Sequence, residues 1–291
     1  MHLPNGNAHW WSGSAAVVIV VLVLVWATPA RSGKLTGPDL IVRTDVLSHQ
    51  WVVRDENLPS TFCSVQEGNV TPGLRRLIRF TVMTPNVGDT DIALGDPNTH
   101  VAANDGLYEF ASCHQHYHFR HYAKYELIDP GTGFVWRAAK RGFCMLDTDP
   151  NPAYFGQPPR NPRFRSCGRI GVPGNQGISA GWADTYRFFL GGQYFVLDGG
   201  DGQPDVPPGA YVIRITVNPG FGPESGESIA FASPDPGHPG VYHQLFESSY
   251  ENNVGEFAVT IPAHPGKGGF GPMANSKVNS IDEDEHDPPS K

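Results

Sequence analysis

The chain has 291 residues, of which 39% are hydrophobic and 17% charged, and its formal net charge is −8. This length is enough for one large or two small domains with an ordinary hydrophobic core. An acidic chain is a poor match for a nucleic-acid-binding protein, because phosphate backbones attract basic surfaces, but it tolerates a cationic substrate. Glycine (34) and proline (27) are abundant, which disfavours long helices and indicates turns and short strands. We therefore predict a mainly β fold.

The N-terminal segment contains an uninterrupted apolar run at residues 15–26, followed by the small residues Ala27, Thr28 and Ala30. A run of this length is typical of a signal peptide and is short for a membrane span. Neighbouring apolar and small residues extend the run at both ends, so an uncleaved signal anchor in a membrane is the alternative. We predict that residues 1–30 direct export, which makes the protein secreted or extracellular.

The body of the chain alternates short strand patterns with turn signals. Strands are expected at 37–43, 50–54, 74–83, 112–118, 121–128, 134–140, 182–190, 193–197, 211–217 and 257–261. Asp-Pro-Gly-Thr-Gly at 129–133 indicates a hairpin turn. Residues 149–181 mix proline and glycine too closely for regular structure, and we expect a long ordered loop. Residues 262–291, rich in Gly and Pro and then acidic, are expected to be disordered.

The most informative stretch is Ser-Cys-His-Gln-His-Tyr-His at 112–118, which places His114, His116 and His118 at alternate positions. Successive side chains of an extended strand point to opposite faces, so these three imidazoles should emerge on one face. Three neutral nitrogens can hold copper, zinc or iron while leaving coordination positions open. The spacing therefore predicts a metal site without naming the metal, and an exposed strand with polar histidines is the alternative.

Four cysteines, Cys63, Cys113, Cys144 and Cys167, are the other residues with distinctive chemistry. An even number fits two disulfides in an oxidising compartment. Metal ligation is the alternative, but no Cys-x-x-Cys spacing supports it. We therefore expect disulfides.

Several blocks of the sequence resemble the catalytic domain of the lysyl oxidase family, over about residues 39–261. The densest blocks are the histidine motif, Lys-Arg-Gly-Phe-Cys-Met-Leu-Asp-Thr at 140–148, and Gln-Gly-Ile-Ser-Ala-Gly-Trp-Ala-Asp-Thr-Tyr at 176–186. Asp-Val-Pro-Pro-Gly-Ala-Tyr at 205–211 and Tyr-Glu-Asn-Asn at 250–253 continue the resemblance in the same order. On this basis we predict a lysyl-oxidase-like catalytic domain at residues 37–261.

The resemblance implies a secreted copper amine oxidase with a β-sandwich core wrapped by long loops. His114, His116 and His118 stand at the family's copper-ligand positions. The family makes its cofactor, lysine tyrosylquinone, by joining a lysine to an oxidised tyrosine, and Lys140 and Tyr186 stand at those positions. Such an enzyme converts primary amines, usually peptidyl lysine, to aldehydes with molecular oxygen, and it releases ammonia and hydrogen peroxide.

The family pattern also bears on the cysteines. Cys113 and Cys167 match a family disulfide, which leaves Cys63 to pair with Cys144.

Two residues are candidates for the base that removes the substrate proton: Asp184, close along the chain to Tyr186, and His121, just beyond the metal strand. A turn hydrogen bond for Asp184 and a surface imidazole for His121 are the ordinary explanations.

Two other functions stay open at this stage. The first alternative is a three-histidine zinc or iron protein without a quinone, as in cupin-like barrels. The second is an extracellular binding module with structural copper. Under the preferred function the substrate is a lysine-bearing protein or a small primary amine. Molecular oxygen is the second substrate, no nucleic acid is expected, and a membrane is a partner only if the leader is retained.

Overall fold

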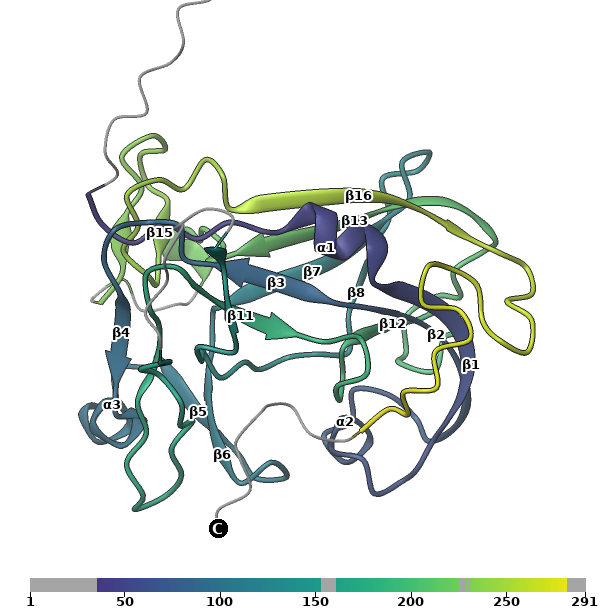
Figure 1. Cartoon of the computed structure of the whole chain (residues 1–291), viewed down its shortest axis with the longest axis horizontal. Helices are drawn as coiled ribbons and strands as arrows, with labels where there is room; N and C mark the ends of the chain where they lie inside the picture. The colour runs from purple at the N-terminus through teal and green to yellow at the C-terminus, as the bar shows by residue number, and fades with distance from the viewer. Residues whose placement is uncertain (1–35, 153–160, 226–228, 230, 282–291) are drawn as a thin grey trace, which may run out of the picture. The chain divides into compact units, whose positions relative to one another are not determined.

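The computed structural model describes residues 36–152, 161–225, 229 and 231–281 (Figure 1). The predicted leader lies outside these residues, and no helix within them is long and apolar enough to cross a membrane. The helices are α1 (Thr44–His49), α2 (Cys63–Gln66), α3 (Pro97–Ala103) and the 3₁₀ helix η1 (Pro223–Ser225). The strands are β1 (Trp51–Leu58), β2 (Gly73–Phe80), β3 (Val82–Pro85), β4 (Ile92–Gly95), β5 (Tyr108–Ala111), β6 (His116–Phe119), β7 (Ala123–Ile128), β8 (Val135–Arg137), β9 (Asp149–Pro150), β10 (Gln176–Ile178), β11 (Trp182–Tyr186), β12 (Tyr194–Val196), β13 (Gly209–Val217), β14 (Ser233–Pro234), β15 (Tyr242–His243) and β16 (Val254–Ile261).

Short antiparallel strands dominate the described chain and its helices are brief, which confirms the predicted mainly β fold with little helix. A four-stranded sheet has the order β16-β13-β7-β8, and a three-stranded sheet has the order β1-β2-β12. A second three-stranded sheet, β3-β11-β9, and the strand pairs β10-β4, β14-β15 and β5-β6 complete the pairing seen in these residues.

Strand β13 shows how the sequence pattern produces the four-stranded sheet. Every second residue from Tyr211 to Val217 is buried, and the three residues between them are partly exposed. This alternation is that of a strand with one face on the core. The strand pairs with β16 on one side and β7 on the other, and Arg214 bonds Glu256 across the exposed face at 2.6 Å. The predicted hairpin turn joins β7 to β8, where the N–H of Gly131 donates to the Asp129 side chain.

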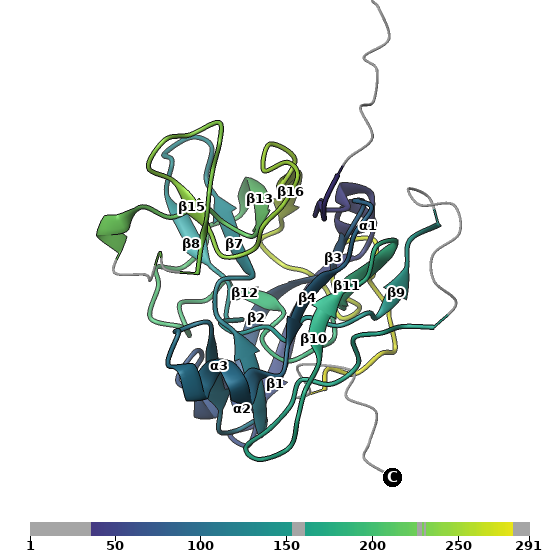
Figure 2. The same ribbon diagram turned by 90° about the vertical axis from the view of Figure 1, so that its left-hand side faces the viewer.

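Figure 2 shows β7, β13 and β16 of the four-stranded sheet above the strands of the sheet β1-β2-β12. Aromatic side chains connect these two sheets. Phe80 on β2 contacts Tyr125 on β7, with ring centroids 5.5 Å apart, and stacks on Phe195 of β12 at 5.0 Å. Trp51 at the start of β1 contacts Phe257 on β16 at 5.9 Å. Edge-on and offset contacts at these distances are favourable for aromatic rings. They place one hydrophobic core between the two sheets, as a β-sandwich core requires.

Two strand predictions are wrong in detail. Residues 37–43 make only an isolated β-bridge, between Leu40 and Asn86, before the chain forms α1. The predicted strand 74–83 is divided at Thr81, which is fully buried. Strand β2 before the break pairs with β1, and β3 after it pairs with β11. The break therefore moves the chain from one sheet to another.

Residues 262–281, which we call the C-terminal arm, are packed against β1 and not disordered as the sequence predicted. Phe270 and Val53 exchange two backbone hydrogen bonds of 2.8 Å, and the Phe270 ring lies 5.9 Å from that of Trp51. The arm runs beside β1 at the yellow end of the chain in Figure 1. Strand β1 is the edge of its sheet, so the arm pairs part of an otherwise open edge. The acidic residues 282–291 lie outside the described residues.

A buried ion pair fixes the turn that follows β11. Arg79 on β2 is fully buried, and its guanidinium donates two hydrogen bonds of 2.9 Å to Glu56. It also donates to the backbone oxygens of Phe188 at 3.2 Å and Leu190 at 3.0 Å. Burial acts to raise the pKa of Glu56, but the charge and hydrogen bonds of Arg79, with smaller contributions from Ser280 and Arg54, outweigh it and leave the pKa lowered. Arg79 therefore connects the sheet to the turn that leads back to the site described below.

Replacing Arg79 should be costly, because it leaves Glu56 with Arg54 as its remaining ionic partner and removes the donors to the backbone oxygens of Phe188 and Leu190. We expect Arg79→Met to lower the free energy of unfolding by about 3–5 kcal/mol. Urea denaturation measures the loss. The matched control is Arg76→Met on the same strand, whose pair with Asp55 is solvent-exposed, and for which about 0–1 kcal/mol is expected. Equal losses in the two variants would contradict the role assigned to the buried pair.

Candidate active site

The histidine motif forms a hairpin and not a single strand. Strands β5 and β6 pair, and residues 112–115 make the turn between them. His116 and His118 lie on one face of β6, as the spacing predicted. His114 belongs to the turn, where Gln115 adopts a left-handed backbone conformation with φ of 61°. The prediction that one strand carries all three imidazoles is therefore wrong for His114, which lies in the turn before β6 begins.

The three imidazoles nevertheless lie together. Their ring centroids are 5.6 Å apart for His114 and His116, 5.4 Å for His114 and His118, and 5.0 Å for His116 and His118. The Nε2 atoms of His116 and His118 are separated by 3.2 Å. Two nitrogens bound to one ion at about 2.0–2.1 Å in tetrahedral geometry are about 3.3 Å apart. Across the described chain, however, no group of three His, Cys, Asp or Glu side chains is arranged to hold a metal ion as it stands.

The position of His118 depends on a glycine. A Cβ atom on Gly142 would lie 2.0 Å from Nδ1 of His118 and 2.5 Å from Cγ, which is far inside van der Waals contact. The same segment is fixed to β6 by the N–H of Phe119, which donates to the Phe143 oxygen at 2.6 Å. Segment 140–144 therefore packs directly on the histidine strand, and residue 142 can carry no side chain.

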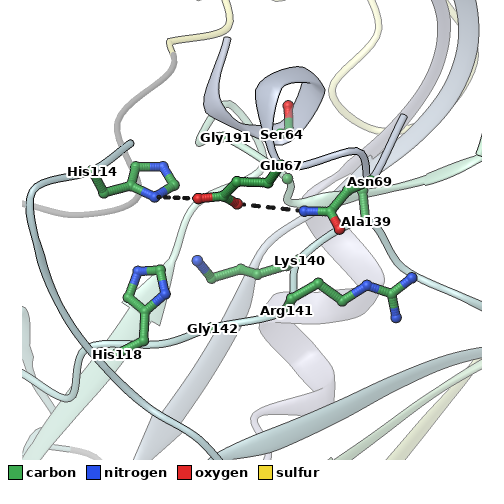
Figure 3. A pocket seen from close by; sticks show the side chains of 11 residues that line it. Ser64, Glu67, Asn69, His114, His118, Ala139, Lys140, Arg141, Gly142 and Gly191 are labelled. Carbon is green, nitrogen blue, oxygen red and sulfur yellow. Dashed lines mark hydrogen bonds and ion pairs between the residues drawn. The ribbon is translucent and has the colours of Figure 1, made fainter. Parts of the chain in front are cut away.

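Lys140 and Tyr186, which the sequence separates by 46 positions, are in contact. Nζ of Lys140 lies 4.5 Å from the centre of the Tyr186 ring and 5.1 Å from that of Phe143. Both Lys140 and Tyr186 are buried. The lysine side chain reaches into a small cavity of about 20 Å³, also lined by His114 and His118 (Figure 3). A volume of this size holds a water molecule or an ion.

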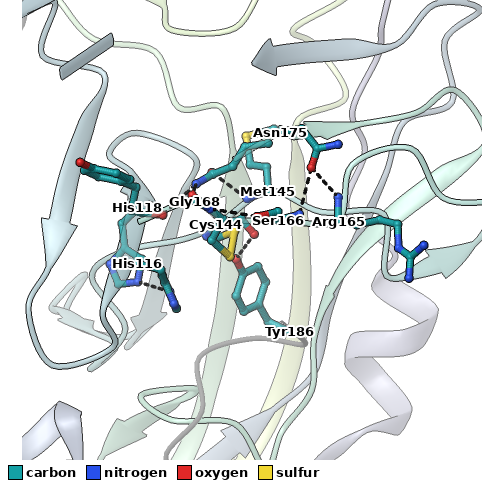
Figure 4. Close-up of a disulfide and its surroundings, with 12 residues drawn as sticks. His116, His118, Cys144, Met145, Arg165, Ser166, Gly168, Asn175 and Tyr186 are labelled. Atoms are coloured by element: carbon teal, nitrogen blue, oxygen red, sulfur yellow. Dashed lines mark hydrogen bonds between the residues drawn. A yellow bond between two sulfur atoms is a disulfide. The ribbon is translucent and has the colours of Figure 1, made fainter. Parts of the chain in front are cut away.

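The phenol of Tyr186 is held by the backbone of Cys144. Its hydroxyl accepts a hydrogen bond from the Cys144 N–H and donates one to the Cys144 oxygen, both at 2.9 Å (Figure 4). The ring also meets Phe143 edge-on, with centroids 5.2 Å apart. Because Tyr186 is at the end of β11, these bonds join that strand to the segment that begins at Lys140.

The disulfides differ from both predicted pairings. Cys63 is bonded to Cys113, and Cys144 to Cys167, with Cα separations of 5.5 and 5.6 Å. Cys113 is in the hairpin turn beside α2, whose first residue is Cys63, whereas Cys144 and Cys167 are both fully buried. One disulfide therefore links the hairpin turn to α2, and the other lies in the core. The predicted Cys113–Cys167 bond does not form, because its two cysteines belong to these different regions.

The predicted long loop at 149–181 is only partly irregular. It begins with β9, which pairs with β11, and it ends with β10, which pairs with β4. Residues 153–160 lie outside the described part of the chain. The side chain of Gln176 donates to the oxygens of Tyr117 and Cys167, at 2.8 and 2.9 Å. These bonds fasten the end of the loop beneath the histidine strand.

Of the two candidate bases, only Asp184 lies near the lysine and tyrosine. Asp184 is on β11 two residues before Tyr186, so both side chains emerge on the same face of the strand. It is buried, and its Oδ2 atom has no hydrogen-bond partner within the described residues. Burial raises the pKa of Asp184 well above its ordinary value, and the positive charge of Lys140 opposes the rise. His121 packs near Phe221, with centroids 6.1 Å apart, and does not line the cavity.

A family comparison agrees with this arrangement. The model of the lysyl oxidase family matches residues 43–228, more than half of the chain. The chain belongs to the lysyl oxidase family. The matched residues include the histidine motif and the segments that carry Lys140 and Tyr186.

Individual lysyl oxidase homologs are similar at modest identity. Lysyl oxidase homolog 2 of Pongo abelii is 28% identical over 231 residues, which are 75% of this chain and 24% of that protein. Lysyl oxidase homolog 4 of Homo sapiens is 27% identical over 196 residues, which are 64% of this chain and 23% of that protein. Lysyl oxidase homolog 3 of Mus musculus is 26% identical over the same length. The chain thus spans about a quarter of the length of these relatives.

Two residues of this lysyl oxidase site were not singled out from the sequence. Glu67, just after α2, has a carboxylate oxygen 3.5 Å from Nδ1 of His114 and lines the cavity. Gly142 provides the space for His118. Neither carried a local signal, because a lone Glu is usually a solvated charge and a lone Gly usually a turn residue. Their roles depend on contacts between distant segments.

The requirement for glycine at position 142 is testable. Gly142→Ala should displace the His118 ring and weaken metal binding at the histidine cluster, because the new methyl group overlaps the imidazole. Gly209→Ala is the control, since its Cβ would meet nothing closer than 3.5 Å. Copper titration of both proteins, with thermal unfolding to confirm the fold, measures the effect. Unchanged copper affinity in Gly142→Ala would contradict this account of the site.

Proposed function

We propose that this chain is a copper amine oxidase that converts primary amines to aldehydes through a lysine tyrosylquinone formed from Lys140 and Tyr186. The proposal depends above all on one observation, the separation of 4.5 Å between Nζ of Lys140 and the Tyr186 ring centre. A buried lysine against a buried tyrosine is an unusual arrangement, because ammonium groups are seldom buried without a functional or ionic partner. Here the lysine of the pair also lines a cavity with His114 and His118.

The donor set fits copper. His114, His116 and His118 would hold the ion, because imidazole nitrogen is a good ligand for copper and for zinc. The 3.2 Å between two of the nitrogens agrees with binding to a common ion, and His114 is within 5.6 Å of both other rings by centroid. Histidine ligands must be neutral to bind the ion. Copper bound here would be adjacent to Lys140 and would serve the oxidation of Tyr186.

The residues around the pair have distinct parts in the proposed reaction. When formed, the quinone supplies a carbonyl group that reacts with an amine and accepts two electrons from it. The backbone of Cys144 fixes the phenol oxygen of Tyr186, and Phe143 and the strand β11 fix the ring plane. Asp184 would accept a proton from the Lys140 ammonium, whose nitrogen must be neutral to bond carbon. After releasing that proton to solvent, the same carboxylate would accept the proton of the substrate α-carbon.

The substrates follow from the balance of this reaction. A primary amine, oxygen and water give an aldehyde, ammonia and hydrogen peroxide. We propose peptidyl lysine or a small primary amine as substrate, and Glu67 at the cavity would attract its ammonium group. The two disulfides agree with a secreted protein, and secretion through residues 1–30, or anchoring by residues 15–26, belongs to the same proposal.

Phenylhydrazine labelling tests the quinone directly, since it reacts with a carbonyl cofactor and not with a metal alone. Copper-loaded protein should give a coloured adduct and a crosslinked peptide containing residues 140 and 186 by mass spectrometry. Tyr186→Phe should lose both and retain copper. Tyr194→Phe is the control, because it also removes a buried hydroxyl, which bonds Ser64.

The result separates the proposed oxidase from the other functions. A wild-type protein that binds copper or zinc but gives no adduct would be a metalloprotein without a quinone or a binding module with structural copper. Amine turnover to aldehyde and hydrogen peroxide by Tyr186→Phe would refute the lysine tyrosylquinone mechanism.

The part given to Asp184 predicts a second phenotype. Asp184→Asn should retain copper, because Asp184 is not one of the three histidine ligands and asparagine keeps the size of the side chain, but should lower amine turnover by roughly 10²-fold or more. Phenylhydrazine reactivity reports whether the cofactor forms, and the dependence of kcat on pH reports whether a proton acceptor has been lost. A wild-type rate with an unchanged pH profile would exclude Asp184 as the proton acceptor.

A further inference from the structure

The C-terminal arm forms a second cavity that the proposed oxidase does not use. The cavity has a volume of about 760 Å³ and lies between the arm and the paired strands β1 and β2. We call it the basic hollow. It is lined by Arg54, Asp55, Arg76, His264, Pro265, Gly266, Lys267, Gly268, Asn275, Ser276 and Lys277. None of these residues lines the cavity around Lys140.

The basic hollow is positively charged in an acidic protein. Its lining contains four Lys or Arg side chains and one carboxylate, a balance of +3, whereas the whole chain has a net charge of −8. The two arginines are already paired, Arg54 with Glu56 and Arg76 with Asp55, each at 2.9 Å. Lys267 and Lys277 are exposed and have no carboxylate partner within the described residues. The positive charge available to a ligand therefore lies on the arm.

Backbone N–H groups add to the positive potential of the basic hollow. Lys267 is part of the sequence Gly-Lys-Gly-Gly at 266–269, and the N–H groups of residues 266, 267 and 268 make no backbone hydrogen bond among the described residues. Gly266 and Gly269 have φ of 78° and 81°, which favours glycine. A glycine-rich turn with free amides beside a lysine is a common way to bind an oxyanion.

The loop is held in place before any ligand arrives. The N–H of Asn275 donates to the Gly268 oxygen at 2.6 Å and closes the loop. Arg76 donates to the Ala263 oxygen, and Arg54 donates to the Ser280 hydroxyl, both at 2.9 Å, so each end of the arm is bonded to the sheet. A rigid loop loses less conformational entropy when a ligand binds. The arm is thus preorganised, with Lys267 and Lys277 on one cavity.

We propose that the basic hollow binds an anionic glycan that carries two or more sulfate or phosphate groups. The cavity is of the size that accepts a ligand of several groups and not a single small anion. Its lining contains no Phe, Tyr or Trp ring on which a nucleic-acid base could stack, which favours a glycan over a single-stranded nucleic acid. His264, Asn275 and Ser276 offer hydrogen bonds to sugar hydroxyls. This proposal is independent of the oxidase function.

Direct binding measurements on the full chain test the proposal. The probes are a heparin-derived hexasaccharide, which carries sulfate, an oligomannose phosphate, which carries phosphate, and a twenty-nucleotide thymidine strand. Isothermal titration should show binding of at least one glycan, weakened by added salt because the contacts are ionic. Lys267→Ala/Lys277→Ala should weaken that binding by about tenfold or more.

The matched control is Arg165→Ala/Arg169→Ala, which removes the same charge from two exposed side chains elsewhere. It should leave glycan affinity within about twofold, as expected for charges outside the contact. Preference for the sulfated or the phosphorylated glycan identifies the anionic group and supports the site in either case. Absence of glycan binding by the wild-type chain, equal loss in the two double variants, or equally tight binding of the thymidine strand would overturn the proposal.

Discussion

The site depends on one junction, the two hydrogen bonds between the Tyr186 hydroxyl and the backbone of Cys144. Through them β11 is bonded to the segment that starts at Lys140, and that segment packs on β6 through Gly142 and Phe143. The tyrosine, the lysine and two histidines are therefore positioned by the same few contacts. The buried Cys144–Cys167 disulfide holds this segment from the other side, so its position does not depend on hydrogen bonds alone.

The junction can position the site only because neighbouring strands hold β11 in place. That strand pairs with β3, and the turn after it is bonded to Arg79 from the neighbouring sheet. Gly192 at the end of the turn approaches Lys140 so closely that a Cβ there would be 3.2 Å from the Lys140 Cα. The Lys140 backbone is therefore held close to this turn, with Nζ 4.5 Å from the centre of the Tyr186 ring.

The sequence predicted what depends on local pattern and missed what depends on distant contacts. The strands expected at 121–128 and 211–217 and the turn signal at 129–133 were confirmed, whereas the pairing of these strands in the four-stranded sheet was not predicted. The resemblance named Lys140 and Tyr186, whose contact no spacing could reveal. The cysteine pairing failed because it requires knowing that the hairpin turn lies against α2. Disorder was wrongly predicted for the C-terminal arm, since composition does not show that β1 leaves an edge to pair.

The charge on Lys140 affects how strongly Asp184 can accept a proton in the proposed chemistry. Burial disfavours the charged carboxylate and raises its pKa, and the positive charge of Lys140 partly offsets this rise. If the Lys140 nitrogen were bonded to the ring, it would no longer carry that charge, and this opposition to the rise in the pKa of Asp184 would be lost. A carboxylate with a higher pKa is a stronger proton acceptor. Formation of the cofactor would therefore convert the counter-ion of the lysine into a better base for the amine oxidation that follows.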